Sequence, residues 1–267
     1  MRICTLGDLL LDVVVRAQGA SGPDVEGSAE TRLAAGGQAA NVAAWASELG
    51  AEARFVGKRG SDPAGELAAR EVELRGVEVL GPVEEGRNGV VVSLVSADGS
   101  RTMLTDRGVA PFLRADELDV RWFAGCEWLH LSGYSLLRRP IEEAAAKAAG
   151  AIQAQGGGIS IDLATAVGIA EYGAAKLVTR LELLRPDVVF ANESELAAIG
   201  GEVPGRLVLK RGADGFTADG VDHPAFPAEV VDTTGAGDAL AAGFLVDGPK
   251  LAAEAAARCV AQLGAMP

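Results

Sequence analysis

The chain is short of the residue types that build disulfides and zinc centres. Among its 267 residues are three cysteines and two histidines: Cys4, Cys126, Cys259, His130 and His223. The cysteines are odd in number, lie far apart and include no Cys-x-x-Cys pair. The sequence therefore argues against a disulfide framework and against a Cys/His zinc site.

Clusters of basic residues are also missing. Lys and Arg number 24 against 37 Asp and Glu, which gives a formal net charge of −13. A nucleic-acid-binding protein needs grouped Lys and Arg to displace counterions from phosphates, so we expect no nucleic acid partner. A nucleotide ligand would have to be held by local groups such as backbone amides, Mg²⁺ and a few placed cations.

Long apolar segments are absent as well. Asp8 and Asp12 interrupt the apolar run at the N-terminus, which is unlike a signal peptide. The longest uncharged stretch, residues 33–47, contains two glycines, a glutamine and an asparagine and is a poor membrane span. We therefore expect a cytoplasmic protein with no membrane partner.

Aromatic residues make up only 4% of the chain, whereas hydrophobic residues make up 49%, so the core must be built mainly from Ala, Val and Leu. In the second half of the chain, apolar runs typical of strands alternate with helical patterns. We expect strands at 127–131, 158–162, 188–191 and 207–210, and helices at 140–155, 172–184, 193–199, 239–245 and 251–263. This alternation predicts an α/β fold with a mainly parallel central sheet and helices on both faces.

The first half predicts a buried strand at 2–6 and helices at 38–49 and 63–75. The second of these helices begins with an Asp62-Pro63 pair, a typical N-cap followed by proline.

Two further segments break the alternation. Residues 13–34 are irregular and glycine-rich, like edge strands joined by a turn, and residues 88–105 have the pattern of a hairpin around Asp98-Gly99. We expect lid segments at about 13–34 and 88–108 to form a small β-sheet lid at the carboxyl edge of the central sheet, where ligands bind in open α/β folds. The whole chain, 1–267, is predicted to be one domain.

The most informative segment is residues 232–238, Asp-Thr-Thr-Gly-Ala-Gly-Asp, followed by an apolar run that predicts a helix. Gly235 and Gly237 flank Ala236 and allow the backbone to bend so that successive amides point in one direction. At a helix N-terminus such amides favour an anion. An acidic side chain at this place, Asp238, indicates a catalytic base that accepts the proton of an attacking hydroxyl while the amides stabilise a transferring phosphoryl group.

Other interpretations of this glycine loop fit less well. A Walker A loop needs a Gly-Lys-Ser/Thr ending, and no lysine stands here. A dinucleotide G-x-G-x-x-G motif would need a glycine at Leu240. A plain turn with a helix cap is the remaining alternative.

Residues 232–238 resemble the C-terminal signature of the ribokinase/PfkB-type carbohydrate kinase family. Residues 36–41, Gly-Gly-Gln-Ala-Ala-Asn, resemble its N-terminal signature. The landmarks between them also match in order, and the resemblance spans nearly the whole chain: Gly7-Asp8 with Asp12, 129–137, 192–195 and 210–215. It implies a ribokinase-like fold and the transfer of a phosphoryl group from ATP to a hydroxyl.

The resemblance also implies roles for single residues. It agrees with Asp238 as the base and with the amides of 235–237 as the anion hole. Asn192 and Glu195 match the family's N-x-x-E motif, in which Glu195 would bind Mg²⁺ through water, since Mg²⁺ keeps part of its water shell. The residues expected along ATP and its phosphates are Asn192, Glu195, Lys210, Gly212 and Gly215. Asp232 is expected to contribute to a site for a monovalent cation such as K⁺.

The substrate side is expected to contain Asp12, Gly36, Gly37 and Asn41, because a carboxylate and an amide offer the donors and acceptors that a polyol needs. Arg107 follows the hairpin and is our candidate for a residue that determines substrate specificity.

Simpler explanations stay open for several of these residues. Asp12 could be a solvated lid residue, Gly36-Gly37 a plain turn, and Asn192 a helix N-cap. Lys210 could be an exposed charge at a strand end and Arg107 a surface arginine. His130 is expected to pack in the core, and Asp162 ends a strand either near the site or in a simple turn.

The chain also departs from the family pattern. It is short, and only a short tail follows Asp238, so we expect reduced C-terminal elements around the adenine pocket and the cation site. Residues 162–165 lack the Pro-Asn and the following arginine that are common there.

Together these features predict an ATP- and Mg²⁺-dependent sugar kinase. A nucleoside kinase of the same family is the nearest alternative, but the lid segments contain no Phe, Tyr or Trp to stack on a base. A catalytically silent sugar-binding protein is a further alternative. An exposed lid with an apolar face often pairs with its twin, so a homodimer through the lid is a hypothesis.

Overall fold

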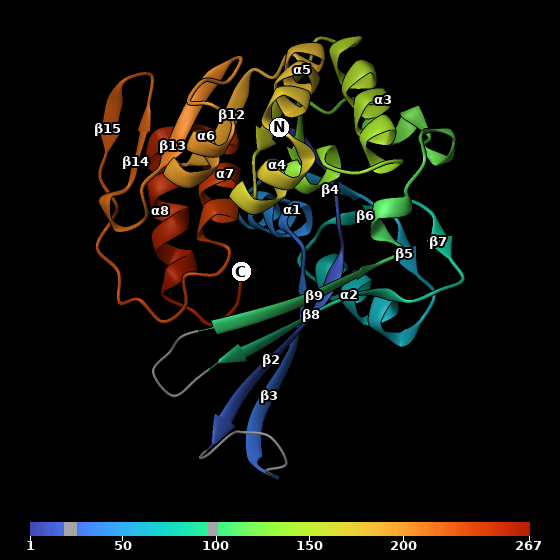
Figure 1. Ribbon diagram of the computed structural model, residues 1–267, viewed down its shortest axis with the longest axis vertical. Coiled ribbons are helices and arrows are strands. Elements are labelled where there is room, and N and C mark those ends of the chain that lie inside the picture. Colours follow the sequence, from blue (N-terminus) through green and yellow to red (C-terminus); the bar gives the residue numbers. More distant parts are fainter. Residues whose placement is uncertain (19–25, 96–100) are drawn as a thin grey trace.

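A nine-stranded sheet forms the centre of the protein in the computed structural model, which describes residues 1–18, 26–95 and 101–267 (Figure 1). The strand order is β15-β14-β13-β12-β11-β10-β1-β4-β6. Neighbours from β6 to β13 are parallel, and β14 and β15 add an antiparallel edge. The strands are β1 (Arg2–Leu6), β4 (Glu52–Val56), β6 (Glu78–Leu80), β10 (Trp128–Ser132), β11 (Gly158–Asp162), β12 (Val188–Asn192), β13 (Arg206–Lys210), β14 (Phe216–Ala218) and β15 (Val221–His223). The mainly parallel sheet predicted from the sequence is confirmed, although the patterns did not predict β4, β6, β14 and β15.

Helices cover both faces of this sheet, as predicted (Figure 1). Along β12, Val188 and Phe190 belong to one buried cluster while Val189 and Ala191 belong to the other, because successive strand residues point to opposite faces. One cluster includes residues of α1 (Gln38–Glu48), α2 (Pro63–Glu73), α7 (Ala236–Asp247) and α8 (Pro249–Val260). The other includes residues of α3 (Ile141–Gln153), α4 (Ala166–Tyr172), α5 (Ala174–Leu184) and α6 (Glu193–Ala198).

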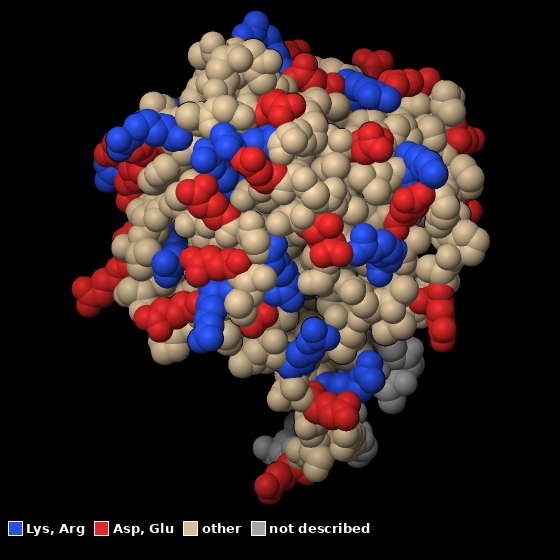
Figure 2. Space-filling model, turned by 180° about the vertical axis from the view of Figure 1, so that it is seen from behind, with Lys and Arg blue, Asp and Glu red and all other residues tan. Residues whose placement is uncertain are grey.

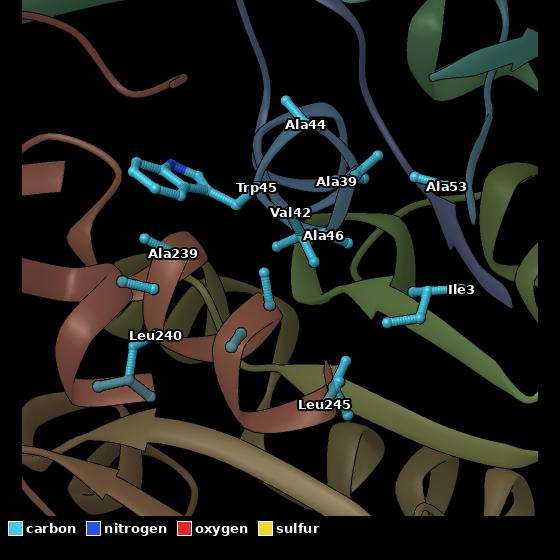
Figure 3. Packing of buried hydrophobic residues seen from close by; sticks show 14 of the residues in the cluster. Ile3, Ala39, Val42, Ala44, Trp45, Ala46, Ala53, Ala239, Leu240 and Leu245 are labelled. Carbon is cyan, nitrogen blue, oxygen red and sulfur yellow. The ribbon is translucent and has the colours of Figure 1, made fainter. Parts of the chain in front are cut away.

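Small side chains let α1 and α7 approach each other closely. Ala39, Val42 and Ala46 of α1 and Ala239 of α7 lie in one cluster, with Trp45 reaching toward the start of α7 (Figure 3). The Trp45 indole Nε1 donates a hydrogen bond of 2.8 Å to the carbonyl of Ala265 and so attaches the C-terminal segment to α1. This packing aligns the N-terminal halves of the two helices, where the functional residues lie.

A separate four-stranded sheet has the order β3-β2-β8-β9. Its strands are β2 (Leu10–Gln18), β3 (Ser28–Gly36), β8 (Asn88–Val95) and β9 (Arg101–Gly108). The described parts of the segments 13–34 and 88–108 lie in this small sheet, although both of the strands expected near 13–34 are longer and more regular than the sequence pattern indicates. That the sheet acts as a lid stays a prediction. β8 and β9 pair antiparallel, as expected for a hairpin, but the predicted turn Asp98-Gly99 lies outside the described residues.

Helix boundaries differ from the predictions most clearly in three places. The helix expected at 239–245 is α7, which already begins at Ala236 and ends at Asp247. The helix expected at 172–184 is preceded by an additional helix, α4, which Thr165 caps by accepting a hydrogen bond from the amide of Gly168 at 3.1 Å. Gly173 separates α4 from α5. The last helix, α8, ends at Val260 rather than at residue 263. At α2, the predicted cap is confirmed, since Asp62 accepts from the amide of Gly65 at 3.0 Å.

Short elements complete the described chain: β5 (Arg59–Gly60), β7 (Val83–Glu84), η1 (Ala110–Phe112), η2 (Ala115–Glu117), η3 (Val120–Phe123), η4 (Gly133–Leu136) and η5 (Gly212–Asp214).

None of the helices in the described ranges is long and apolar enough to cross a membrane. Acidic and basic side chains intermix over the face shown in Figure 2. The absence of a nucleic acid partner stays a prediction.

Phe190 offers a test of the core. Its ring is fully buried on β12 and meets Phe244 of α7 edge-on at a centroid distance of 5.6 Å. We expect Phe190→Ala to lower the free energy of unfolding by about 3–5 kcal/mol, because it removes the ring and leaves a cavity. Leu183→Ala, at a position 71% exposed on α5, should change it by less than about 0.5 kcal/mol. Urea denaturation of both variants would measure the difference, and equal effects would contradict it.

Candidate active site

The glycine loop enters α7 through a tight backbone turn. Gly235 is the N-cap residue with φ 80°, and a Cβ at this position would lie 2.6 Å from Cα of Ala265. Only glycine fits this conformation and this contact. Asp238 then lies in the first turn of α7 and is buried, with 9% exposure.

The predicted anion hole needs one correction. The amide of Ala236 donates to the carbonyl of Thr233 at 3.3 Å, so it is engaged within the turn. In the part of the chain that the structure describes, no carbonyl accepts from the amides of Gly235 or Gly237. An anion site at this helix N-terminus would therefore rest on these two amides and not on all three.

Asn41 connects α1 to the carboxylate of Asp238. Its Nδ2 donates to Oδ2 of Asp238 at 2.7 Å. Its Oδ1 is buried and accepts no hydrogen bond from any described residue. A buried acceptor without a donor is costly, so a ligand hydroxyl that donates to Oδ1 would satisfy it.

Burial raises the pKa of Asp238 from its ordinary value of 3.8 to about 7. The hydrogen bond from Asn41 and the charge of Lys210 oppose this rise, while the charges of Asp162 and Asp12 add to it. A carboxylate that titrates near neutral pH is matched to general base catalysis.

Lys210, at the end of β13, forms an ion pair with Asp162 at the end of β11. Its Nζ donates to Oδ2 of Asp162 at 2.6 Å and lies 3.8 Å from Oε2 of Glu195. Burial would lower the pKa of Lys210, but these two carboxylates outweigh it, so the pKa is raised and the side chain stays charged. The alternative of an exposed lysine is therefore wrong. Asp162 was expected either near the site or in a simple turn, and it does both. Besides its ion pair with Lys210, its Oδ1 accepts from the amide of Ala164 at 2.9 Å in the turn after the strand.

Asn192 and Glu195 form a capping box at α6. The side chain of Asn192 accepts from the amide of Glu195 at 2.9 Å, and Oε2 of Glu195 accepts from the amide of Asn192 at 2.8 Å. The N-cap alternative for Asn192 is thus confirmed. Burial raises the pKa of Glu195, and the nearby Lys210 opposes the rise.

The predicted substrate residues meet where the small sheet joins α1. Gly37 has φ 101°, and a Cβ there would lie 2.2 Å from the carbonyl oxygen of Asp8. A Cβ on Gly36 would lie 2.3 Å from Oδ2 of Asp12, so this carboxylate rests against the glycine backbone. Burial raises the pKa of Asp12 to about 6, which contradicts the alternative of a freely solvated residue.

Arg107 is not a free surface arginine. Its Nη1 donates to Oδ2 of the buried Asp8, and its guanidinium carbon lies 3.8 Å from the ring centroid of Tyr134. Burial raises the pKa of Asp8, and the charge of Arg107 opposes that rise.

A cavity of about 630 Å³ opens beside the glycine loop. Asn192, Lys210, Gly212, Gly215 and Gly237 line it, as expected for residues along a nucleotide. The sequence reasoning missed its apolar walls, which come from the segment before the glycine loop and from α7 and α8: Phe226, Val230, Leu240, Ala253, Ala256 and Val260. α8 forms one wall of the cavity, so the C-terminal region does contribute to it. The apolar spacing along α8 was the signal that could have identified this wall. The expectation that the C-terminal elements are reduced relative to the family stays a prediction.

Asp232 holds the start of the loop in place. Its Oδ1 accepts from the amide of Thr234 at 2.7 Å and its Oδ2 from the amide of Gly264 at 3.0 Å. The monovalent-cation site expected beside it stays a prediction.

Comparison with known proteins decides the family. The pfkB family of carbohydrate kinases matches residues 1–266. The chain belongs to this family.

Its similarity to individual members agrees with this assignment. The ATP-dependent ribose-1-phosphate kinase of Halopiger xanaduensis is 36% identical over 92% of this chain and 84% of its own length. A fructokinase of Escherichia coli is 30% identical over 91% of this chain and 83% of its own length. Among solved structures, an adenosine kinase from Sinorhizobium meliloti superposes with a TM-score of 0.88 at 24% identity, covering 99% of this chain and 95% of that chain, which establishes the shared fold.

The family, the ribokinase-like fold and a phosphotransferase with a hydroxyl acceptor are thus confirmed for this pfkB-family chain. The roles of the single site residues stay predictions.

The pKa of Asp238 makes stability depend on pH in this pfkB-family protein. A folded-state pKa near 7 against 3.8 when unfolded means that the folded protein binds this proton more tightly. The resulting stabilisation is complete below about pH 4 and is lost as the pH rises through 7. We expect Asp238→Asn, which carries no charge, to raise the free energy of unfolding at pH 8 by about 1–4 kcal/mol.

Urea denaturation of the wild type and Asp238→Asn at pH 4 and pH 8 would measure the difference between their free energies of unfolding. This difference should be close to zero at pH 4. An equal difference at both pH values would show that Asp238 titrates normally.

Proposed function

We propose that this protein is an ATP-dependent kinase that phosphorylates a hydroxyl group of a small sugar, with Asp238 as the catalytic base. The observation that carries the proposal is the buried carboxylate of Asp238, which bonds to Asn41 at 2.7 Å and directly follows Gly237 in the lining of the nucleotide-sized cavity. An acidic side chain in the first turn of a helix is common, but Asp238 is also buried and bonded to Asn41, which places it to accept a proton beside the cavity.

The residues of the chain suggest how the acceptor is activated. A substrate hydroxyl that donates to Oδ2 of Asp238 would pass its proton to that oxygen as the hydroxyl attacks. Asn41 already donates to Oδ2 and would keep the carboxylate oriented, while its unpartnered Oδ1 could accept from a neighbouring hydroxyl. Asp12 would accept from a further hydroxyl across the site.

The cavity fits a nucleotide. Its apolar walls suit the flat face of a base. The positive Lys210 and Gly237, the residue before Asp238, belong to the same lining and would hold the phosphates. When bound, ATP supplies the phosphoryl group and Mg²⁺ neutralises charge on its phosphates. In the described ranges no group of three His, Cys, Asp or Glu side chains gathers as a metal site. The buried carboxylate of Glu195 suits Mg²⁺, which takes one or two carboxylates and completes its shell with water and phosphate oxygens.

A sugar is the favoured acceptor. The lid segments contain no aromatic residue that could stack on a nucleobase. The names of two relatives, a ribose-1-phosphate kinase and a fructokinase, point in the same direction. The adenosine kinase shares the fold at an identity that supports no inference about substrate.

A substrate panel tests the proposal. ADP release should be measured with ribose, fructose, ribose 1-phosphate and adenosine in the presence of ATP and Mg²⁺. Turnover of a sugar acceptor is expected. Turnover of adenosine alone would favour the nucleoside kinase, and binding of a sugar without any ADP release would favour the silent binding protein.

Removing the base tests its assignment. We expect Asp238→Asn to lower kcat by about 10²–10⁴-fold, because the hydroxyl proton loses its acceptor. Binding of a non-hydrolysable ATP analogue, followed by calorimetry, should persist. In the wild type, kcat/KM should rise with pH through about 7, as Asp238 loses its proton. A wild-type rate in the variant would show that Asp238 is not the catalytic base.

We also propose a homodimer formed through the small sheet. One row of direct neighbours crosses all four strands on the face opposite Asp12: Leu33, Val13, Val92 and Leu104. In this row Leu33 is 54% exposed and Leu104 is 58% exposed. A row of this kind is self-complementary about a two-fold axis, because each copy offers the same apolar surface.

Sedimentation velocity tests the dimer. The wild type should sediment as a dimer at micromolar concentration, and Leu104→Asp should shift it to the monomer because a charge enters the apolar row. Leu183→Asp, on exposed α5, is the matched control. A monomeric wild type would contradict the proposal.

The three free cysteines and the need for ATP fit a cytoplasmic location, which we propose as well.

A further inference from the structure

Arg107 is a cation at the edge of the substrate region. Pairs Asn88–Gly108 and Val90–Asp106 between β8 and β9 place Arg107 beside Gly89, which pairs with Leu10 of β2. Leu10 is two residues from Asp12, so Arg107 and Asp12 lie on the same face of the small sheet, two rows apart. The side chain of Arg107 is 20% exposed, so part of it is open to solvent.

Asp8 and Tyr134 hold the Arg107 guanidinium but leave most of its donors available. Only Nη1 bonds to Asp8, and in the described part of the chain no group accepts from Nε or Nη2. The ring of Tyr134 supports the flat guanidinium at 3.8 Å. This arrangement fixes the plane of the arginine and presents a free edge with several N–H groups.

Arg138 is a second positive charge within electrostatic range of Asp8. It follows η4, the short helix that contains Tyr134, and its charge acts on the carboxyl group of Asp8. The side chain is exposed and forms no ion pair with any described residue. The adjacent Arg139 differs, because its Nε lies 3.1 Å from Glu142 and its Nη2 lies 3.4 Å from Glu143.

Two guanidinium groups exceed what a neutral sugar requires. Hydroxyl groups are satisfied by the carboxylates and the amide already present in Asp12, Asn41 and Asp238. Guanidinium groups instead match the paired oxygens of a phosphate or a carboxylate. In a chain with net charge −13, an anionic substrate also needs local cations to offset the general repulsion.

We propose that the sugar phosphorylated by this protein already carries an anionic group, a phosphate monoester or a carboxylate, and that Arg107 and Arg138 bind it. Asp8 is then a positioning residue, which acts by fixing the orientation of Arg107. The proposal rests on the kinase function proposed above and names its substrate class. With a phosphate as the anionic group, the product would be a sugar bisphosphate.

The test compares acceptors of different charge. ADP release should be measured with ribose and fructose as neutral acceptors, ribose 1-phosphate and ribose 5-phosphate as phosphate acceptors, and gluconate as the carboxylate. We expect kcat/KM for one anionic acceptor to exceed that for every neutral one by about tenfold or more, the size of one charge-assisted hydrogen bond. The preferred anion identifies the group.

Matched variants on one loop then locate the subsite. Arg138→Gln should raise KM for the preferred anionic acceptor by about tenfold with little change in kcat, because it removes a binding cation and no reacting group. Arg139→Gln should change KM by less than about twofold, since its charge is taken up by Glu142 and Glu143. Arg107→Lys keeps the charge but loses the planar fork, and it should also raise KM. Calorimetric binding of the anionic acceptor without ATP should likewise weaken in Arg138→Gln and Arg107→Lys and stay nearly unchanged in Arg139→Gln.

Two results would overturn the proposal. Equal kcat/KM for neutral and anionic sugars would remove the anion subsite and leave the kinase function in place. Equal losses in Arg138→Gln and Arg139→Gln would show a general charge effect instead of a subsite. A failure of the kinase function looks different, since no acceptor would then release ADP, and anion binding in the calorimeter would still report on the two arginines.

Discussion

The hydrogen bond between Asn41 and Asp238 is the contact on which the candidate site depends. The two residues are 197 positions apart, on α1 and α7, and their side chains meet at 2.7 Å in a buried region. The meeting is possible because alanines on both helices allow a close approach above the central sheet. The same burial that brings the carboxylate into this contact deprives it of water and raises its pKa to about 7. The close packing of small residues therefore buries the proposed base and, through that burial, raises its proton affinity.

A second set of charges stabilises the opposite side of the site. The ends of β11, β12 and β13 are neighbours in a parallel sheet, so Asp162, Glu195 at the start of α6 and Lys210 converge at its carboxyl edge. Lys210 is held charged by two carboxylates in a buried place, which keeps a fixed cation beside the glycine loop. Asp162 also forms the turn after its strand, so one side chain supports both the backbone and the charge. The substrate side has a different balance of charges: it contains the buried Asp8, the half-buried Asp12, the tethered Arg107 and the exposed Arg138.

Much of the architecture could be predicted from local patterns. The glycine loop, the Asp62 cap and the Asn192–Glu195 capping box involve residues within a few positions of each other, and their geometry follows from backbone requirements. The alternation of strands and helices beyond residue 127 was equally clear. The strands β4, β6, β14 and β15 were not, because their formation depends on pairing with neighbours in the sheet, which the local pattern does not encode.

The sequence by itself determined the family, the parallel α/β architecture and the identity of most polar residues in the candidate site, because ordered motifs and hydrophobic periodicity are local properties of the chain. Only the tertiary structure decided which of these residues meet. It showed that the Ala236 amide is used within its own turn, that α8 forms a wall of the nucleotide-sized cavity, and that Arg107 is held by Asp8 and Tyr134. The physical reason is that burial, pKa and hydrogen-bond partners depend on contacts between distant segments, and spacing along the chain does not encode those contacts one by one.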